Sequence, residues 1–276
     1  MTPAVILGSS FSKTPLSLNQ EPVEIDTSWG RVCLYQIKTQ NSNPHASAYV
    51  IYRHGLPHNT LPHQVNFRGY IEALKSVGCT ALLLTSSVGV LQSNIPLYTP
   101  LLAHDLLMPF NRLPTGEVCT LFPLPTAKQG HLVLQDGLFS SQLNQNIAHL
   151  IKQIGLSQGP SVTFAYVPGP RTKTKAENRF WRLCGADVNS MSIGPEVVLA
   201  NEAHIPTSAL LIGHKYSLDQ TQEGSSKHAE SHTQKSIHDS LIASREAMER
   251  IILAFLQTPM NPPFKNTLYT FDETRG

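Results

Sequence analysis

Short apolar runs recur along the chain, and each of them ends in small or turn-forming residues. Runs of this length are typical of buried β-strands, because ordinary helices need a longer periodic segment. The pattern predicts strands at residues 4–7, 31–36, 48–52, 81–84, 162–167 and 208–213. The segments between these strands are long enough for helices, so we expect a parallel or mixed sheet.

Between the apolar runs, hydrophobic residues recur at the three- and four-residue spacing of amphipathic helices. Asn66 can cap the first helix, because an asparagine side chain accepts a bond from a free backbone N–H. Helices are expected at residues 67–77, 139–155 and 174–184, from Pro195 to about Ala203, and at 232–257 near the C-terminus. The alternation indicates an α/β protein whose central sheet is covered by helices.

No repeat or linker divides the chain, so we expect a single domain over residues 1–276. Residues 216–235 are polar and almost free of aliphatic side chains, which favours a loop or lid before the last helix. The tail at residues 258–276 contains three prolines and is expected to lie over the surface or a neighbouring subunit.

Composition narrows the classes of function. The net charge is +2 and only 14% of residues are charged, so nucleic acid is not expected as a partner. No segment is long and apolar enough to span a membrane, and the first residues lack a signal-peptide pattern. The cysteines are far apart, which is typical of reduced thiols in a cytoplasmic protein: Cys33, Cys79, Cys119 and Cys184.

An arginine beside a histidine follows the strand expected at 48–52. Arg53 offers a planar fork of N–H donors, and His54 adds a donor whose charge is adjustable near neutral pH. Strand ends are where α/β proteins bind ligands. The pair therefore predicts an anion clamp, although a surface loop with scattered cations would show the same two residues.

Three further strand or helix ends carry hydroxyl groups. Ser9 follows the first strand, Ser86 and Ser87 follow the strand at 81–84, and Ser192 precedes an expected helix start. Tight turns and helix N-termini let backbone N–H groups approach an oxyanion. Any one of these serines could simply cap a turn. Together with the arginine and histidine, they predict a phosphate pocket.

A metal site is not expected, although the chain has twelve histidines. His54, His58 and His63 lie close together in the sequence, but prolines interrupt the segment that contains them. No helix could align these three imidazoles, and no acidic ligand is near. Zinc sites normally show a tighter ligand pattern.

Taken together, these motifs resemble the trimeric purine nucleoside phosphorylase and methylthioadenosine phosphorylase family. The resemblance spans roughly residues 4–258 and is carried, in order, by residues 7–9, 53–58, 62–66, 85–91, 169–171, 176–177 and 191–196. Pro-His-Gln-Val-Asn at 62–66 most resembles the methylthioinosine phosphorylase branch. The resemblance implies a single α/β domain with a central mixed sheet, partly closed into a barrel and flanked by helices, in a homotrimer.

The activity implied by the resemblance is phosphorolysis of a purine nucleoside, or of a 5′-methylthio purine nucleoside, in purine salvage. Inorganic phosphate would be the co-substrate, and no metal or organic cofactor is implied. The residues at phosphate-contact positions are Ser9, Arg53, His54, Ser87 and Ser192, with Ser86 on the same turn as Ser87. The nucleoside positions are Met191 against the ribose, His58 at the sugar edge, His131 towards a neighbouring subunit's site and His232 over the 5′ group.

The base-recognition positions depart from the family. Thr172 and Lys173 stand where relatives carry an aromatic or apolar residue and, in 6-oxopurine enzymes, a glutamate. Lys215, after His214, stands near the place of an asparagine or aspartate. A lysine only donates hydrogen bonds, whereas the residues it replaces supply an acceptor.

Three interpretations of these departures remain open. Lys215 could donate to purine N7 and act with His54 as a catalytic group. Lys173 and Lys215 could instead point to solvent, with the purine met by other residues such as His214 or Glu177. Finally, the site could have lost purine recognition. The corresponding functions are a phosphorylase, a phosphorylase with an altered base preference, and a catalytically lapsed paralogue that binds phosphate or nucleoside.

Overall fold

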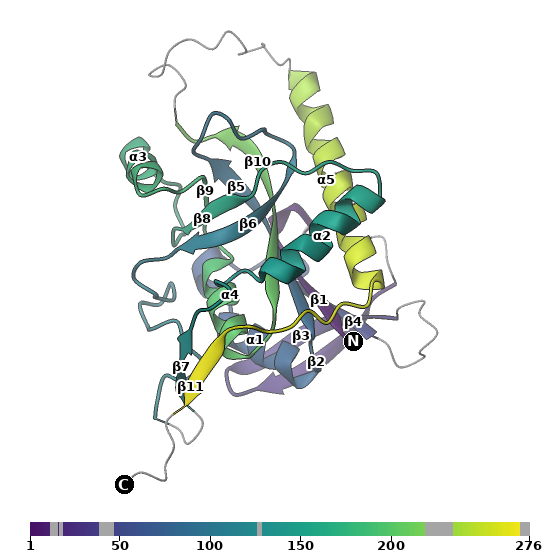
Figure 1. The fold of residues 1–276 in the computed structure, drawn as a ribbon, viewed down its shortest axis with the longest axis vertical. Coiled ribbons are helices and arrows are strands. Elements are labelled where there is room, and N and C mark those ends of the chain that lie inside the picture. The colour runs from purple at the N-terminus through teal and green to yellow at the C-terminus, as the bar shows by residue number, and fades with distance from the viewer. Residues whose placement is uncertain (12–15, 17–18, 39–46, 126–128, 219–233, 271–276) are drawn as a thin grey trace.

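A nine-stranded mixed sheet runs through the protein, in a computed structural model that describes residues 1–11, 16, 19–38, 47–125, 129–218 and 234–270 (Figure 1). In sheet order its strands are β10 (Thr207–Tyr216), β6 (Pro100–Leu107), β8 (Val162–Tyr166), β9 (Val188–Ser190), β5 (Ala81–Val90), β1 (Pro3–Leu7), β4 (Ser47–Tyr52), β3 (Gly30–Lys38) and β2 (Glu21–Thr27). Because β10 also pairs with β5, the strands from β10 to β5 close into a barrel. The others extend from it as an open sheet, which confirms the expected fold class.

The expected helices are all present, with ends shifted by a few residues. They are α1 (Phe67–Ser76), α2 (Ser141–Gln153), α3 (Lys175–Leu183), α4 (Gly194–Glu202) and α5 (Gln234–Gln257). The Asn66 side chain accepts a hydrogen bond from the Gly69 N–H at 3.0 Å, which confirms the predicted cap of α1.

The helices cover two faces of the sheet, as successive residues of β1 show. Ala4 and Ile6 belong to one core, into which α1 and α4 pack, whereas Val5 and Leu7 belong to the other, with α2 and α5. All four side chains are almost completely buried. A strand buried on both faces has apolar residues at nearly every position, which is why the sequence pattern predicted β1.

Several strands were not expected from the sequence. These are β2, β6, β9 and the separate two-stranded ribbon of β7 (Gly130–Val133) and β11 (Thr267–Thr270). β2 is an edge strand rich in acidic residues, β9 has only three residues, and the ribbon is mostly exposed. β2, β9 and the ribbon lack the apolar run that marks a buried strand. β6 does begin with a buried apolar run, which ends at His104 and Asp105. The C-terminal tail therefore contributes a strand, and most of the expected loop at 216–235 lies outside the described residues.

One correction concerns the hydroxyl residues after 81–84. They were expected to form a turn, but β5 continues through them to Val90. Ser86 and Ser87 pair with Leu211 and Ile212 of β10. The ladder with β10 continues through these polar residues and holds them in a strand.

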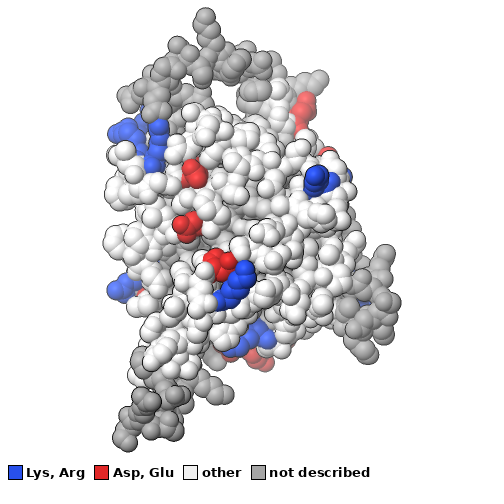
Figure 2. All heavy atoms as spheres, in the orientation of Figure 1, with Lys and Arg blue, Asp and Glu red and all other residues white. Residues whose placement is uncertain are grey.

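Charged side chains are scattered over the face shown in Figure 2. On the face in Figure 2, basic and acidic residues are interspersed, and neither sign gathers into a patch. Within the described part of the chain, no helix has the length and apolar character needed to cross a membrane. The four cysteines are free thiols.

Asn266 fastens the segment after α5 to the body of the protein. Its Oδ1 accepts the backbone N–H groups of Gln135 and Asp136 at 2.8 and 3.0 Å. Its Nδ2 donates to the Gly137 carbonyl at 2.6 Å and to Asn201 Oδ1 at 2.8 Å. These bonds hold the chain that leads into β11 beside the segment that follows β7.

We expect Asn266→Ala to lower the free energy of unfolding by about 2–4 kcal/mol, because buried donors and acceptors lose their partner. Chemical denaturation measures this loss. Lys265→Ala is a matched control, since Lys265 is half-exposed and approaches Asp136 only at 3.9 Å. Its effect should stay below about 0.5 kcal/mol. Equal losses in the two variants would contradict the anchoring role of Asn266.

Candidate active site

A cavity of about 300 Å³ opens near the carboxyl ends of the parallel strands β1, β4, β5 and β10. This volume is at the lower end of the range for small-molecule sites. The cavity is lined by Gly8, Ser9, Arg53, His54, Pro62, Ser86, Ser87, Val88, Gly89, Lys173, Asn189, Ser190, Met191, Ser192, His214 and Lys215. Strand ends distant in the sequence therefore meet at one place, as expected for this class of fold.

Most of the residues singled out from the sequence line this cavity. They are Ser9, Arg53, His54, Ser86, Ser87, Lys173, Met191, Ser192, His214 and Lys215. Pro62, Asn189 and Ser190 were not assigned a role from the sequence. The polar residues that directly precede Met191 were the available signal for Asn189 and Ser190, but the three-residue strand that presents them was not recognised.

Three predicted residues are absent from the lining, and a fourth lies outside the described residues. Thr172 is exposed and is not part of the lining. His58 stacks on His54, with ring centroids 4.7 Å apart, and is also absent from the lining. His131 lies in β7 against Tyr269, so its reach into a neighbouring subunit stays a prediction. His232 lies outside the described residues.

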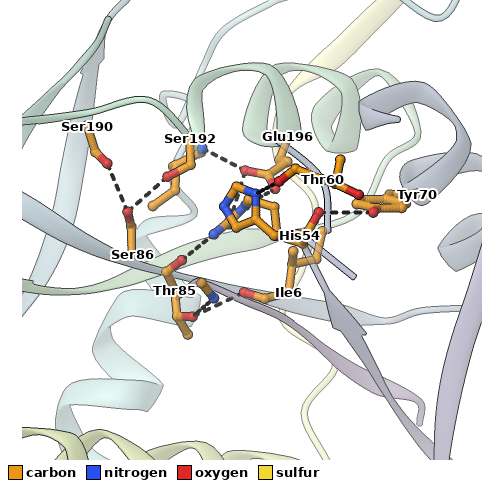
Figure 3. A network of polar contacts seen from close by, with 12 residues as sticks. Ile6, His54, Thr60, Tyr70, Thr85, Ser86, Ser190, Ser192 and Glu196 are labelled. Atoms are coloured by element: carbon orange, nitrogen blue, oxygen red, sulfur yellow. Dashed lines mark hydrogen bonds and ion pairs between the residues drawn. The ribbon is translucent and has the colours of Figure 1, made fainter. Parts of the chain in front are cut away.

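Serine hydroxyls from separate segments form a cluster, of which Figure 3 shows Ser86 with Ser190 and Ser192. Ser86 Oγ lies 2.9 Å from Ser192 Oγ and 3.2 Å from Ser190 Oγ, and Ser10 Oγ lies 2.8 Å from Ser87 Oγ. A hydroxyl can rotate to donate or accept, so this cluster can turn its O–H groups towards an anion. The cluster joins the chain after β1, strands β5 and β9, and the turn before α4.

Arg53 does not present the free fork of donors that the sequence suggested. Its Nε and Nη2 donate to Glu196 Oε1 and Oε2 at 2.5 and 3.2 Å, and its Nη1 donates to the Thr85 carbonyl at 2.7 Å. Arg53 is 1% exposed and Glu196 is fully buried. A buried guanidinium is stable only with such a partner. Three of its five N–H groups are therefore used, which leaves two for a ligand.

His54 is neutral rather than a cation of adjustable charge. Burial, followed by the charge of Arg53, lowers the pKa of His54 to about 4. Its Nδ1 lies 3.0 Å from the Thr60 carbonyl, which can only accept, so Nδ1 carries the proton. Nε2 of the neutral ring is then an acceptor. This corrects the expectation that His54 donates to an anion through a second ring N–H.

Lys173 and Lys215 bring positive charge to another part of the lining. Lys173 is half-buried and Lys215 is exposed. Burial and then the charge of Lys215 lower the pKa of Lys173 to about 8, against a smaller opposing effect of Glu177. Burial and the charge of Lys215 also lower the pKa of His214. Both lysines line the cavity, and Lys215 is also exposed, so the interpretation in which they point to solvent stays a prediction.

Glu177 caps the start of α3. It accepts the Thr174 N–H at 2.8 Å in a capping box at the start of α3, and its Oε1 lies 2.7 Å from Arg171 Nη2. Arg171 and the Thr174 backbone lower its pKa to about 2.

Among the described residues, no group of three or more His, Cys, Asp or Glu side chains could hold a metal ion.

Comparison with known proteins places this chain in a family. A model of the phosphorylase superfamily matches residues 4–257. The S-methyl-5′-thioadenosine phosphorylase of Thermofilum pendens is 34% identical over 155 residues, which make up 55% of this chain and 56% of that protein. The S-methyl-5′-thioadenosine phosphorylase of Hyperthermus butylicus is 31% identical over 205 residues, or 73% of this chain and 71% of the relative.

Solved structures show the same fold at low sequence identity. Methylthioadenosine phosphorylase from Schistosoma mansoni, in complex with adenine, superposes with a TM-score of 0.75 at 19% identity, covering 93% of this chain and 90% of that one. The match with the Thermofilum relative spans just over half the length of that protein. The superfamily model, in contrast, extends from the first strand to the end of the last helix. The protein therefore belongs to the phosphorylase superfamily.

Proposed function

We propose that the protein catalyses phosphorolysis of a purine nucleoside, or of a 5′-methylthio purine nucleoside, to a free base and a sugar 1-phosphate. The observation that carries the proposal is the convergence of serine hydroxyls beside Arg53 and His54 in one cavity. The S-methyl-5′-thioadenosine phosphorylases among its relatives support the same reaction class.

Phosphate has to be held as the nucleophile. As the bond between C1′ and N9 lengthens, the sugar acquires oxocarbenium character, and an oriented phosphate both attacks C1′ and stabilises the cation. Ser9, Ser87 and Ser192 can supply O–H donors, and Arg53 retains two N–H groups. Nε2 of neutral His54 can accept a hydrogen bond from a phosphate hydroxyl or from a sugar hydroxyl.

Met191 is well placed to pack against the sugar. A Cβ at Gly169 would come within 2.6 Å of Met191 Sδ, so the methionine lies close over this glycine. Pro62 and Met191 both line the cavity. A flexible thioether can follow the apolar face of a ribose.

We infer that the active protein is a cytoplasmic homotrimer in purine salvage that needs no metal or organic cofactor. The support is the resemblance to trimeric phosphorylases. In such a trimer, His131 of one subunit would reach the site of its neighbour, and His232 would cover the 5′ group. Light scattering after size exclusion measures the oligomeric state, and a stable monomer with full activity would contradict the trimer.

The proposed reaction predicts that base is released only when phosphate is present. The test is a panel of inosine, guanosine, adenosine, methylthioadenosine and methylthioinosine, with and without phosphate, read by chromatography of the free base. Release that needs phosphate supports the proposal. Release without phosphate would indicate a hydrolase, and phosphate binding without any release would indicate the lapsed paralogue.

Ser192→Ala should raise the KM for phosphate about 10-fold, because a hydrogen bond to a charged group contributes about 1.5 kcal/mol. This variant is preferable to Arg53→Ala, which would leave Glu196 buried without its partner. Ser240→Ala on α5 is the matched control, since that hydroxyl donates only to the Ser236 carbonyl at 2.8 Å. An unchanged KM for phosphate in Ser192→Ala would remove Ser192 from the phosphate site.

The low pKa of His54 predicts a stability change with pH. The pKa of His54 is about 4 in the folded protein, whereas a histidine in the unfolded chain has a pKa of about 6.5. Between these values the unfolded chain binds more protons, so this contribution to stability is complete above about pH 6.5 and is lost as the pH falls towards 4. His54→Gln should therefore lose less stability than wild type between pH 7 and pH 4.5 in urea denaturation, and parallel losses would contradict the assignment.

A further inference from the structure

The described lining of the cavity contains basic side chains but no aspartate or glutamate. The charge of Arg53 is neutralised by Glu196. Glu177, the acid whose field reaches Lys173, is paired with Arg171 outside the lining. The excess positive charge in the cavity therefore comes from Lys173 and Lys215.

The lysines lie beyond the serine cluster along the sheet. In the parallel pairing of β5 with β10, Ser87 is level with Ile212, and Gly89 is level with Lys215. Gly89 is two residues past Ser87, or roughly 7 Å along a strand. Lys173 reaches the same region from the segment before α3, close enough for the charge of Lys215 to lower its pKa.

Two polar atoms at this end of the cavity have no hydrogen-bond partner among the described residues. Asn189 Oδ1 and His214 Nδ1 are buried and make no hydrogen bond to any described residue. Asn189 lies level with Gly89 in the pairing of β5 with β9, and its Nδ2 donates to Asn178 Oδ1 at 3.0 Å. That bond fixes the orientation of the amide, so its oxygen remains free to accept. Buried polar atoms are normally paired, and a bound ligand would satisfy them.

We propose that Lys173, Lys215 and Asn189 form a base site that selects 6-oxopurines over 6-aminopurines. This inference rests on the proposed phosphorolysis and specifies its substrate. A 6-oxopurine presents O6 and N7 as acceptors for the two ammonium groups, and a ring N1–H for Asn189 Oδ1. A 6-aminopurine would direct its amino N–H groups at lysines that cannot accept them.

The same lysines favour the departure of an oxopurine. When the C1′–N9 bond breaks, its electron pair passes into the purine while a phosphate oxygen forms the new bond to C1′. The leaving base then carries negative charge, part of which resides on O6. Two ammonium groups beside O6 and N7 stabilise this charge as it develops, which lowers the barrier more than it strengthens ground-state binding.

Titration calorimetry with free bases tests the selectivity directly. In saturating phosphate, hypoxanthine should bind about 10- to 100-fold more tightly than adenine, because adenine leaves buried polar groups of the site unpaired. Equal affinities, or tighter binding of adenine, would overturn the inference.

Variants assign the selectivity to the lysines. Lys173→Gln and Lys215→Gln should each weaken hypoxanthine binding about 10-fold, in the range of a hydrogen bond to a charged group, and change adenine binding little. Lys175→Gln removes a nearby charge from α3 outside the lining and should leave both affinities unchanged. Hypoxanthine binding that survives in both cavity variants would overturn the role of the lysines. Circular dichroism confirms that each variant is folded.

The outcomes separate this inference from the proposed function. A preference for hypoxanthine without turnover of any nucleoside would support the base site and contradict phosphorolysis. Phosphate-dependent turnover with a preference for adenine and adenosine would support phosphorolysis and overturn the base site.

Discussion

The buried ion pair between Arg53 and Glu196 is the interaction on which the site depends. It joins the end of β4 to α4, and through the Thr85 carbonyl it also reaches β5 (Figure 3). Glu196 Oε2 accepts the Ile193 N–H at 2.6 Å, where the backbone has a φ of 71°. A non-glycine residue keeps this left-handed conformation only when its surroundings hold it. Glu196 thereby fixes the turn that presents Ser192.

This pair also divides the cavity electrostatically. With Arg53 neutralised and His54 uncharged, the serine end offers directed hydrogen bonds rather than excess charge. The excess cationic charge lies at the end with Lys173 and Lys215. Such an arrangement suits a reaction in which phosphate must be oriented at one end while negative charge develops on a leaving base at the other.

The sequence predicted the parts of the fold that follow from burial. Strands buried on both faces and amphipathic helices were found because their apolar patterns are imposed by the core. β2 and the β7–β11 ribbon were missed because they are exposed and polar. In the site, sequence motifs located the serines and Arg53. The ion pair of Arg53 with Glu196 was not predicted, because it joins residues 143 positions apart and no local pattern encodes it.

A crystal structure of the protein with bound phosphate tests the central claim most directly. The account predicts phosphate among Ser9, Ser87 and Ser192, within hydrogen-bond distance of the free Arg53 N–H groups, with the Arg53–Glu196 pair intact. Phosphate held instead by Lys173 and Lys215, or an Arg53 that has left Glu196 to bind the anion, would contradict it.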